Sequence, residues 1–258
     1  MKYALHVRGG RPATQDFADR LTDEIESTGG TVLDDPEATP EMVIAVGGDG
    51  TMLAAVQSAV AFDVPVLGFN LGTLGFLTVA EPDDLTAVVK RLANGEFDVQ
   101  TRLTVKASIG GVSAVGVNDV VVEKVDSTRL VNLTVVIDGT EFATYRADGL
   151  IIATPTGSTA YSFSAGGPVV DPEVDALVLT PVASHSLFDR PVVLPADSKI
   201  ELTARTDRLV RVNVDKTDLG QISEGGRVDV SRGDRFARFV TFGSTTFPGL
   251  VRQKFRLE

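Results

Sequence analysis

The segment MVIAVGGDGT, residues 42–51, indicates the fold class of the first part of the chain. Its first five residues, 42–46, form a continuous apolar run, which is typical of a parallel strand that is buried on both faces. The glycine-rich turn that follows leads into a helix-like stretch from Met52 to about Ala61. Glycines let the backbone approach a ligand closely and a helix start offers unpaired N–H groups, so this turn is a candidate phosphate-binding loop.

Strand and helix signals alternate on both sides of this segment. Upstream, Phe17, Leu21 and Ile25 recur every four residues, which predicts one buried helix face, with Asp16 as its N-cap. The other predicted elements are strands at 3–7, 31–33 and 64–69 and a helix from Pro82 to about Gly95. This alternation of strands and helices predicts an open parallel sheet.

From about Phe97 the pattern changes to short runs rich in β-branched residues. Asp138-Gly139 lies between two such runs and is a strong signal for a type I′ hairpin. We therefore predict an open parallel α/β domain at 1–96, followed by a mostly antiparallel, β-sandwich-like domain at 97–246. The tail, about 247–258, is expected to return to the first domain.

The composition is that of a globular, acidic protein without cysteine. The chain has 258 residues, of which 43% are hydrophobic, and no apolar run is long enough to span a membrane. The absence of cysteine excludes disulfides, zinc–thiolate sites and thiol nucleophiles. The formal charge of −11 argues against a nucleic-acid partner, which normally requires a basic patch. The first residues contain too short an apolar core for a secretory signal, so we expect a cytoplasmic location.

The acidity has two readings. One is solubility alone. The other is adaptation to high salt, because Asp outnumbers Glu and Arg outnumbers Lys by about two to one. Such lysine-poor, acidic surfaces resemble those of proteins from salt-loving organisms, such as halophilic archaea, where concentrated cations screen the self-repulsion.

The loop at 47–51 is neither of the two common nucleotide loops. It lacks the Gly-Lys-Ser/Thr of a Walker A loop and the third glycine of the dinucleotide fingerprint. A carboxylate inside an anion-binding loop makes sense if Mg²⁺ is present or if Asp49 takes a proton from an attacking hydroxyl. The alternative is a tight strand-to-helix turn in which Asp49 only caps the helix.

Two further motifs each leave two readings open. GFNLGTLGF, residues 68–76, follows a buried strand and suits a binding crevice as well as a structural loop. Asn118-Asp119 interrupts the apolar segment 115–122, and such polar residues are costly to bury unpaired. They therefore face a ligand or each other, or they belong to an ordinary bulge or hairpin turn.

The longest motif is DGLIIATPTGSTAYSFSAGGP, residues 148–168. An apolar strand leads directly into a stretch dense in hydroxyl groups and glycine, which favours a surface for sugar hydroxyls, amides and phosphate oxygens over a solvated loop. His6 and His185 are the only histidines, so nothing supports a histidine-based metal cluster. We assign His6 to a structural role in the first strand. His185 has two readings: it lies near the pocket, or it has no part in the site.

These four segments, in this order, resemble the NAD kinase family. The Gly-Gly-Asp-Gly-Thr loop at 47–51 is shared with diacylglycerol and sphingosine-type lipid kinases, and similar loops occur in phosphofructokinases. Segment 148–168 together with Asn118-Asp119 is more specific for NAD kinases. The resemblance extends from about Met42 to Pro195 and is looser at Val214-Asp215 and near Gly220.

The resemblance implies a role for each matching residue. Asp49 matches the catalytic aspartate, and Gly50 and Phe76 match positions that line the adenosine pocket. Asn118 and Asp119 match contacts to the adenine or ribose groups of NAD, although many members carry Glu in place of Asp119. The other matching positions are Gly48 and Thr51 in the loop, Asp148 and Ala183 near the nicotinamide end, and Thr156, Thr159, Ala160, Tyr161 and Ser164 in the binding segment. The family usually forms dimers or tetramers.

The implied reaction is the transfer of the terminal phosphoryl group of ATP or polyphosphate to the 2′-hydroxyl of the adenosine ribose of NAD, giving NADP. Mg²⁺ or another divalent cation is the implied cofactor, and Asp49 is the implied proton acceptor. Two alternatives stay open. One is a lipid or sugar kinase with the same loop, and the other is a sensor that binds NAD without phosphorylating it.

Overall fold

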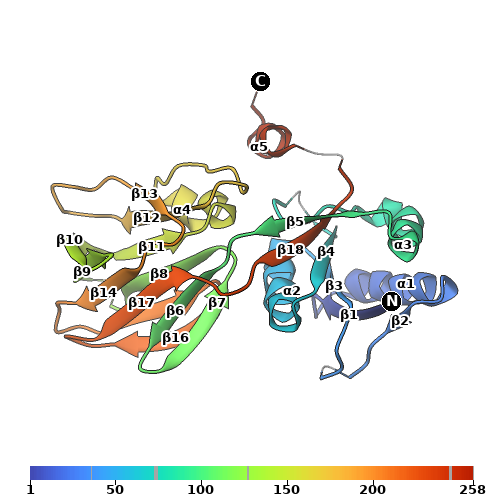
Figure 1. Cartoon of the computed structure of the whole chain (residues 1–258), viewed down its shortest axis with the longest axis horizontal. Helices are drawn as coiled ribbons and strands as arrows, with labels where there is room; N and C mark the ends of the chain where they lie inside the picture. The colour runs from blue at the N-terminus through green and yellow to red at the C-terminus, as the bar shows by residue number, and fades with distance from the viewer. Residues whose placement is uncertain (36, 73–74, 127, 244–245, 258) are drawn as a thin grey trace. The chain divides into compact units, whose positions relative to one another are not determined.

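The computed structural model describes residues 1–35, 37–72, 75–126, 128–243 and 246–257 (Figure 1). The chain divides into two compact units. Unit 1 contains 1–101 and 237–258, and unit 2 contains 102–236. No helix in the described ranges has the length and apolarity needed to cross a membrane.

Unit 1 is built on one six-stranded sheet. Its order is β2-β1-β3-β4-β18-β5. The strands are β1 (Lys2–Val7), β2 (Thr31–Val32), β3 (Met42–Gly47), β4 (Pro65–Asn70), β5 (Asp98–Arg102) and β18 (Ala237–Thr241). The pairs β1–β2, β1–β3, β3–β4 and β4–β18 are parallel, and every residue of β3 is buried. The predicted α/β architecture is confirmed, and β2, β1, β3, β4 and β18 form its parallel part.

The helices of unit 1 follow the sequence periodicity closely. They are α1 (Pro12–Ser27), α2 (Asp49–Phe62), α3 (Leu85–Asn94) and α5 (Phe247–Phe255), with a 3₁₀ turn η1 (Pro82–Asp84) before α3. Phe17, Leu21 and Ile25 are buried as predicted. The predicted N-cap Asp16 is wrong, because α1 begins at Pro12, whose fixed φ suits the first helical position.

The return of the chain to unit 1 begins earlier than expected. We placed it at about 247, but β18 already pairs with β4 in the sheet (Figure 1). Phe239 and Val240 of β18 are 6% and 1% exposed, and Val240 packs in one core cluster with Leu67 of β4. Burial against this sheet therefore determines where residues 237–241 belong.

Unit 2 consists of two six-stranded antiparallel sheets. Their orders are β10-β9-β14-β17-β6-β7 and β13-β12-β11-β8-β15-β16. The strands are β6 (Val105–Ile109), β7 (Val112–Gly116), β8 (Asp119–Lys124), β9 (Val131–Ile137), β10 (Thr140–Ala147), β11 (Gly149–Ala153), β12 (Ala176–Val182), β13 (Val192–Pro195), β14 (Ile200–Ala204), β15 (Val210–Val214), β16 (Thr217–Ile222) and β17 (Arg227–Arg232). Two short helical segments follow β11, η2 (Thr156–Thr159) and α4 (Tyr161–Ser164).

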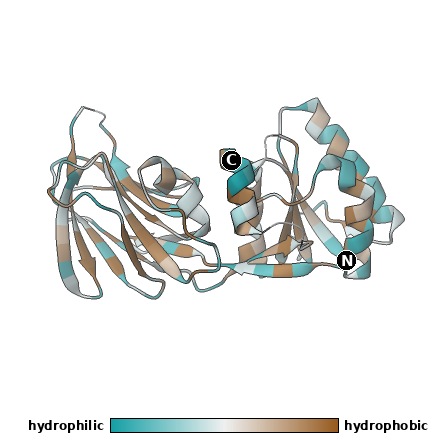
Figure 2. Ribbon diagram, turned by 90° about the horizontal axis from the view of Figure 1, so that it is seen from above, coloured by the Kyte–Doolittle hydropathy of each residue, from teal (hydrophilic) through white to brown (hydrophobic). Residues whose placement is uncertain are grey.

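The core of unit 2 lies between its two sheets. Residues of both sheets, such as Leu133 of β9 and Leu150 of β11, belong to one cluster and are fully buried. Figure 2 shows the apolar residues concentrated along the strands. Asp138 and Gly139 have φ values of 49° and 79°, as a type I′ turn requires, so the predicted hairpin between β9 and β10 is confirmed.

Candidate active site

Asp49 lies at the carboxyl end of β3, where it begins α2. Gly48 is the extended N-cap of that helix. The Asp49 carboxylate accepts hydrogen bonds from the backbone N–H groups of Phe76 at 3.2 Å and Leu77 at 3.3 Å. The loop that follows β4 therefore holds the carboxylate at the start of α2.

Two glycines make this arrangement possible. A Cβ atom at Gly47 would lie 2.4 Å from the hydroxyl of Thr51, which is too close for any side chain. A Cβ atom at Gly75 would lie 2.1 Å from Oδ1 of Asp49. Gly75 is therefore required where the loop meets the catalytic candidate, and Thr51 packs against the Gly-Gly turn.

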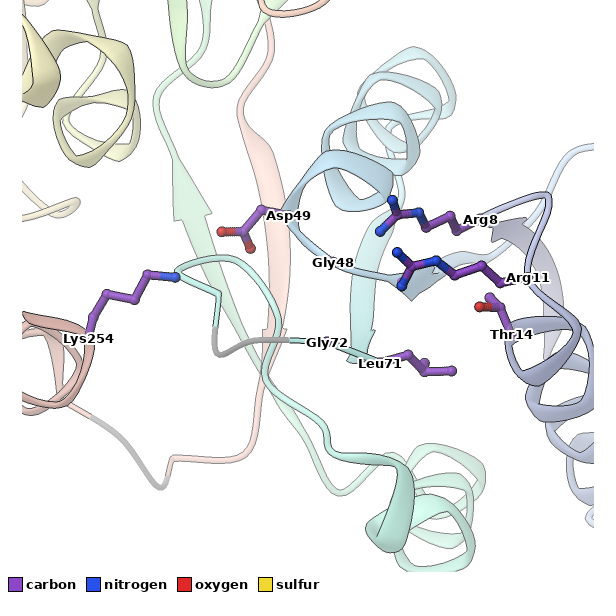
Figure 3. Close-up of a pocket in the computed structure, with 9 residues that line it drawn as sticks. Arg8, Arg11, Thr14, Gly48, Asp49, Leu71, Gly72 and Lys254 are labelled. Carbon is purple, nitrogen blue, oxygen red and sulfur yellow. The ribbon is translucent and has the colours of Figure 1, made fainter.

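A cavity of about 160 Å³ lies beside Asp49 in unit 1 (Figure 3). It is lined by Arg8, Arg11, Thr14, Gly47, Gly48, Asp49, Leu71, Gly72 and Lys254. Leu71 and Gly72 belong to the predicted crevice segment 68–76, so part of that segment does line a cavity; Thr73 and Leu74 lie outside the described residues. Gly50 lies in the first turn of α2.

Phe76 is half-buried and contacts the last helix of unit 1. Its ring centroid lies 5.9 Å from that of Phe255, and the ammonium of Lys254 lies 5.4 Å from the Phe76 ring. The residue predicted to line an adenosine pocket thus also holds α5.

Asn118 and Asp119 lie where the chain crosses from one sheet of unit 2 to the other. β7 and β8 belong to different sheets, so this segment is a crossing and not a hairpin turn. The Asp215 carboxylate accepts hydrogen bonds from the backbone N–H groups of Val117, Asn118 and Asp119, at 2.8, 2.9 and 3.0 Å. One side chain at the end of β15 therefore fixes the crossing.

The Asp119 side chain is almost fully buried. Residue Asp119 is only 5% exposed, and burial raises the pKa of its carboxyl to about 7, with a further contribution from the charge of Asp215. Burial also raises the pKa of Asp215, while its three N–H donors oppose that rise. The pair therefore brings a titratable carboxyl near neutral pH to the predicted ligand surface.

Segment 148–168 is tied directly to this crossing. The Thr154 hydroxyl donates to the carbonyl oxygen of Val117, and the Thr154 N–H donates to that of Asn118 at 2.8 Å. A Cβ atom at Gly157 would lie 2.1 Å from the Asn118 carbonyl oxygen. The structure therefore brings two separately predicted motifs together.

The hydroxyl groups of this segment divide into internal and exposed ones. Ser158 bonds the carbonyl oxygens of Pro155 and Val170, and Ser162 bonds the Thr180 hydroxyl at 2.8 Å. Thr156 is also buried, Thr159 and Ala160 are half-buried, and Tyr161 and Ser164 are exposed. Only part of the hydroxyl-rich segment is therefore available to a ligand.

Asp148 lies at the far end of β11, next to Val182, the residue that precedes Ala183. The Asp148 N–H donates to the carbonyl oxygen of Val182 at 2.9 Å, and the Asp148 carboxylate forms an ion pair with Lys124. At the other end of β11, Ala153 pairs with Asp119. The strand of five residues between these ends is about 17 Å long. The predicted residues of unit 2 thus suit an extended ligand.

Acidic residues at both ends of β11 act on the Tyr161 side chain. It is 40% exposed, and burial raises the pKa of its phenol, helped by the charges of Glu123, Asp148 and Asp119. His185 is exposed, and its backbone N–H bonds the carbonyl oxygen of Arg146.

Several residues that lie around these groups were not predicted from the sequence to belong to the site. They are Arg8, Arg11 and Lys254 at the cavity of unit 1 and Thr154 and Asp215 at the crossing of unit 2. The turn Arg8-Gly9-Gly10-Arg11 carried a signal, since a basic glycine turn after the first strand ends at the same sheet edge as the Asp49 loop. Asp215 carried a weak signal in the looser resemblance at Val214-Asp215, whereas Lys254 carried none, because only the tertiary fold brings it near.

Two family models cover most of the chain. Residues 13–97 match the ATP-NAD kinase N-terminal domain, and residues 117–242 match the ATP-NAD kinase C-terminal domain. The chain belongs to the NAD kinase family.

Relatives in this family match along nearly the whole chain. An NAD kinase of Symbiobacterium thermophilum is 37% identical over 98% of both chains. An NAD kinase of Methanopyrus kandleri is 39% identical over 83% of this chain and 77% of its own. The family assignment sets aside the lipid or sugar kinase alternative.

Two solved structures have the same fold. Yeast NADH kinase complexed with NADH has a TM-score of 0.86 and 25% identity, over 100% of this chain and 87% of its own. An NAD kinase from Archaeoglobus fulgidus in complex with ATP has a TM-score of 0.78 and 26% identity, over 94% of each chain. The predicted combination of an α/β domain with a β-rich domain is therefore confirmed as that of NAD kinases.

Proposed function

We propose that this chain transfers the terminal phosphoryl group of ATP or polyphosphate to the 2′-hydroxyl of the adenosine ribose of NAD, giving NADP. The observation that carries the proposal is the Asp49 carboxylate, which two backbone N–H groups hold at the edge of a cavity. The bound NADH of the yeast relative and the bound ATP of the archaeal relative support the two substrates.

Asp49 is the proposed proton acceptor. The 2′-hydroxyl oxygen forms a bond to the terminal phosphorus as the bond from that phosphorus to the bridging oxygen of the donor breaks. Asp49 takes the hydroxyl proton, and ADP or a shortened polyphosphate leaves. The two N–H groups occupy part of the carboxylate's acceptor capacity and leave the rest for the substrate. Such a positioned base typically contributes about 10²–10⁴-fold in rate.

The residues of unit 2 are proposed to bind NAD. We assign Asn118 and Asp119 to the adenine or ribose groups, and Asp148 and Ala183 to the nicotinamide end. Tyr161 offers an exposed ring face for stacking. The remaining contacts are assigned to Gly48, Gly50, Thr51 and Phe76 in unit 1 and to Thr156, Thr159, Ala160 and Ser164 in unit 2.

The residues around Asp49 fit a Mg²⁺ ion that arrives with the donor. Asp49 is the one carboxylate among the described residues that line the cavity. Mg²⁺ is usually held by one or two carboxylates together with substrate phosphates and waters. When bound, the ion neutralises the charge of the phosphates and so favours attack by the hydroxyl.

NADP formation by the full chain, with NAD, Mg²⁺ and either ATP or polyphosphate, is the direct test. We expect Asp49→Asn to lower kcat by about 10²-fold or more, because the amide cannot accept the proton. The dissociation constant for NAD, measured by calorimetry, should stay within about twofold. Asp63→Asn, at the opposite end of α2, is the matched control and should keep full turnover.

Each outcome of this experiment has a clear meaning. Unchanged turnover in Asp49→Asn would refute the base assignment. NAD binding by the wild type without NADP formation, with either donor, would instead favour the sensor. We also propose that the chain forms a homodimer or homotetramer, and light scattering measures this oligomeric state. The proposed location is the cytoplasm.

A further inference from the structure

Asp215 bonds three consecutive residues of the crossing between β7 and β8. Its Oδ2 accepts the N–H of Val117 at 2.8 Å, and its Oδ1 accepts the N–H groups of Asn118 and Asp119 at 2.9 and 3.0 Å. In return, the Asp215 N–H donates to the carbonyl oxygen of Asp119 at 2.9 Å. Hydrogen bonds in both directions therefore join the end of β15 to a segment that lies 96–98 residues away in the chain.

The backbone on both sides leaves room for this carboxylate. Asp215 has a φ of 51°, in the left-handed region that aspartate tolerates better than most residues. On the other side, a Cβ atom at Gly116 would lie 2.7 Å from Oδ1 of Asp215, which is too close for any side chain. The turn after β15 and the start of the crossing are therefore both shaped around the Asp215 carboxylate.

The crossing is held from a second side by Thr154. The Thr154 hydroxyl donates to the carbonyl oxygen of Val117, and the Thr154 N–H donates to that of Asn118. Asp215 thus takes the N–H groups of the crossing and Thr154 takes two of its carbonyl oxygens. Because the backbone is fixed by both, the directions of the Asn118 and Asp119 side chains are set before a ligand arrives.

Asp215 also acts on Asp119 through its charge. Burial raises the pKa of the Asp119 carboxyl to about 7, and the charge of Asp215 adds to that rise. The other titratable group that interacts with Asp119 is the Tyr161 phenol of α4, whereas β11 pairs with it through Ala153. A change at Asp215 therefore alters both the place of Asp119 and its titration.

We propose that Asp215 is a positioning residue for NAD: its carboxylate fixes the backbone of Asn118 and Asp119 for contact with the adenine or ribose groups, and its charge acts on the Asp119 carboxyl. Asp215 needs no contact of its own with NAD for this role. The inference rests on the proposed function for the identity of the ligand, and it concerns binding, which is measurable whether or not turnover follows.

Two variants of Asp215 remove different parts of the carboxylate. Asp215→Asn keeps one acceptor oxygen for Asn118 and Asp119 and places an NH₂ group against the N–H of Val117. Asp215→Gly removes all three bonds and keeps a residue that tolerates the left-handed backbone. Calorimetry on the full chain should give a Kd for NAD about fivefold higher in Asp215→Asn and about thirtyfold higher in Asp215→Gly.

Steady-state kinetics separates this role from a general loss of structure. Both variants should raise the KM for NAD, whereas kcat at saturating NAD and the KM for the phosphoryl donor should stay within about threefold, because Asp49 is untouched. Asp138 provides matched controls, since it too has a left-handed backbone, with a φ of 49°, and accepts a backbone N–H, that of Lys199 at 2.8 Å. Asp138→Asn and Asp138→Gly should keep the wild-type KM for NAD.

The pH profile of NAD binding tests the effect of the charge. Only an ionised carboxylate accepts hydrogen bonds without donating one, so the Kd of the wild type should fall as Asp119 ionises near pH 7. Both Asp215 variants remove the same charge, so both should move the midpoint to lower pH although their Kd values differ. Asp138→Asn should leave the midpoint in place. An unmoved midpoint in both Asp215 variants would contradict the proposed action of the charge on Asp119.

The outcomes distinguish this inference from the proposed function. An unchanged Kd for NAD in both Asp215 variants overturns the positioning role, even if the wild type makes NADP. A loss of kcat with an unchanged KM for NAD overturns it as well, and so do equal losses in the Asp138 variants. A raised Kd in a chain that makes no NADP supports the positioning role and contradicts the NAD kinase reaction. If the wild type does not bind NAD, both proposals fail.

Discussion

Asp119 shows how burial changes the chemistry of a single residue. Its pKa rises to about 7, so the folded protein binds a proton there that the unfolded chain has already lost above about pH 4. The folded state therefore binds more protons between about pH 4 and pH 7, and stability falls as the pH rises through this window. Above about pH 7 both states are ionised and this contribution is constant.

We expect Asp119→Asn to remove this pH dependence, because the amide does not titrate. Relative to the variant, the wild type should lose up to about 4 kcal/mol of unfolding free energy between pH 4 and pH 7.5. Urea denaturation of both proteins across this range measures the difference. Asp215 is present in both proteins, so its own titration largely cancels from the difference between their unfolding free energies. If the unfolding free energies of the two proteins changed with pH in the same way, Asp119 would not be the group with the raised pKa.

Two elements meet at Asp49, the first turn of α2 and the loop after β4. Their contact depends on Gly75, since a Cβ atom there would lie 2.1 Å from Oδ1 of Asp49. Gly75→Ala should displace the carboxylate and lower kcat by about 10²-fold, the cost of a misplacement of about 1 Å. The Kd for NAD should change little, which calorimetry measures.

Gly9→Ala is the matched control for this contact. No atom lies within 4 Å of a Cβ atom built at Gly9, and its backbone is not in the left-handed region. This variant should keep the wild-type kcat. Equal losses in both variants would point to a general effect on unit 1, whereas wild-type turnover in Gly75→Ala would show that Asp49 tolerates displacement.

At the scale of the whole molecule, the formal charge of −11 makes self-repulsion a general cost of folding. Exposed Asp16, Asp19 and Asp23 illustrate this, since they lie three and four residues apart along α1. Raising KCl from about 0.05 to 1 M shortens the screening length to about 3 Å. We therefore expect the melting temperature to rise with salt by several degrees.

Calorimetric melting of the wild type and of a variant with these three aspartates changed to asparagine measures this effect. The variant should melt at a higher temperature in low salt and respond less to KCl. A melting temperature that does not depend on salt would contradict the high-salt hypothesis and leave solubility as the explanation of the acidic composition.

Features that depend on residues close together in the chain could be predicted from the sequence alone. The apolar run at 42–46 gives the buried strand β3, the four-residue spacing of Phe17, Leu21 and Ile25 gives the buried face of α1, and Asp138-Gly139 gives the hairpin. The same local signals identified the candidate loop at Asp49, because a strand, a glycine turn and a helix start are contiguous in the chain.

Contacts between segments far apart in the chain could not be predicted and are seen only in the folded structure. β18 joins the first sheet because its buried side chains complete that core, Asp215 holds the crossing at Val117 from 98 residues away, and Lys254 borders the cavity of Asp49. No local pattern encodes these contacts. They follow from burial of apolar surface and from satisfying backbone N–H groups, which depend on the whole fold and not on neighbours in the chain.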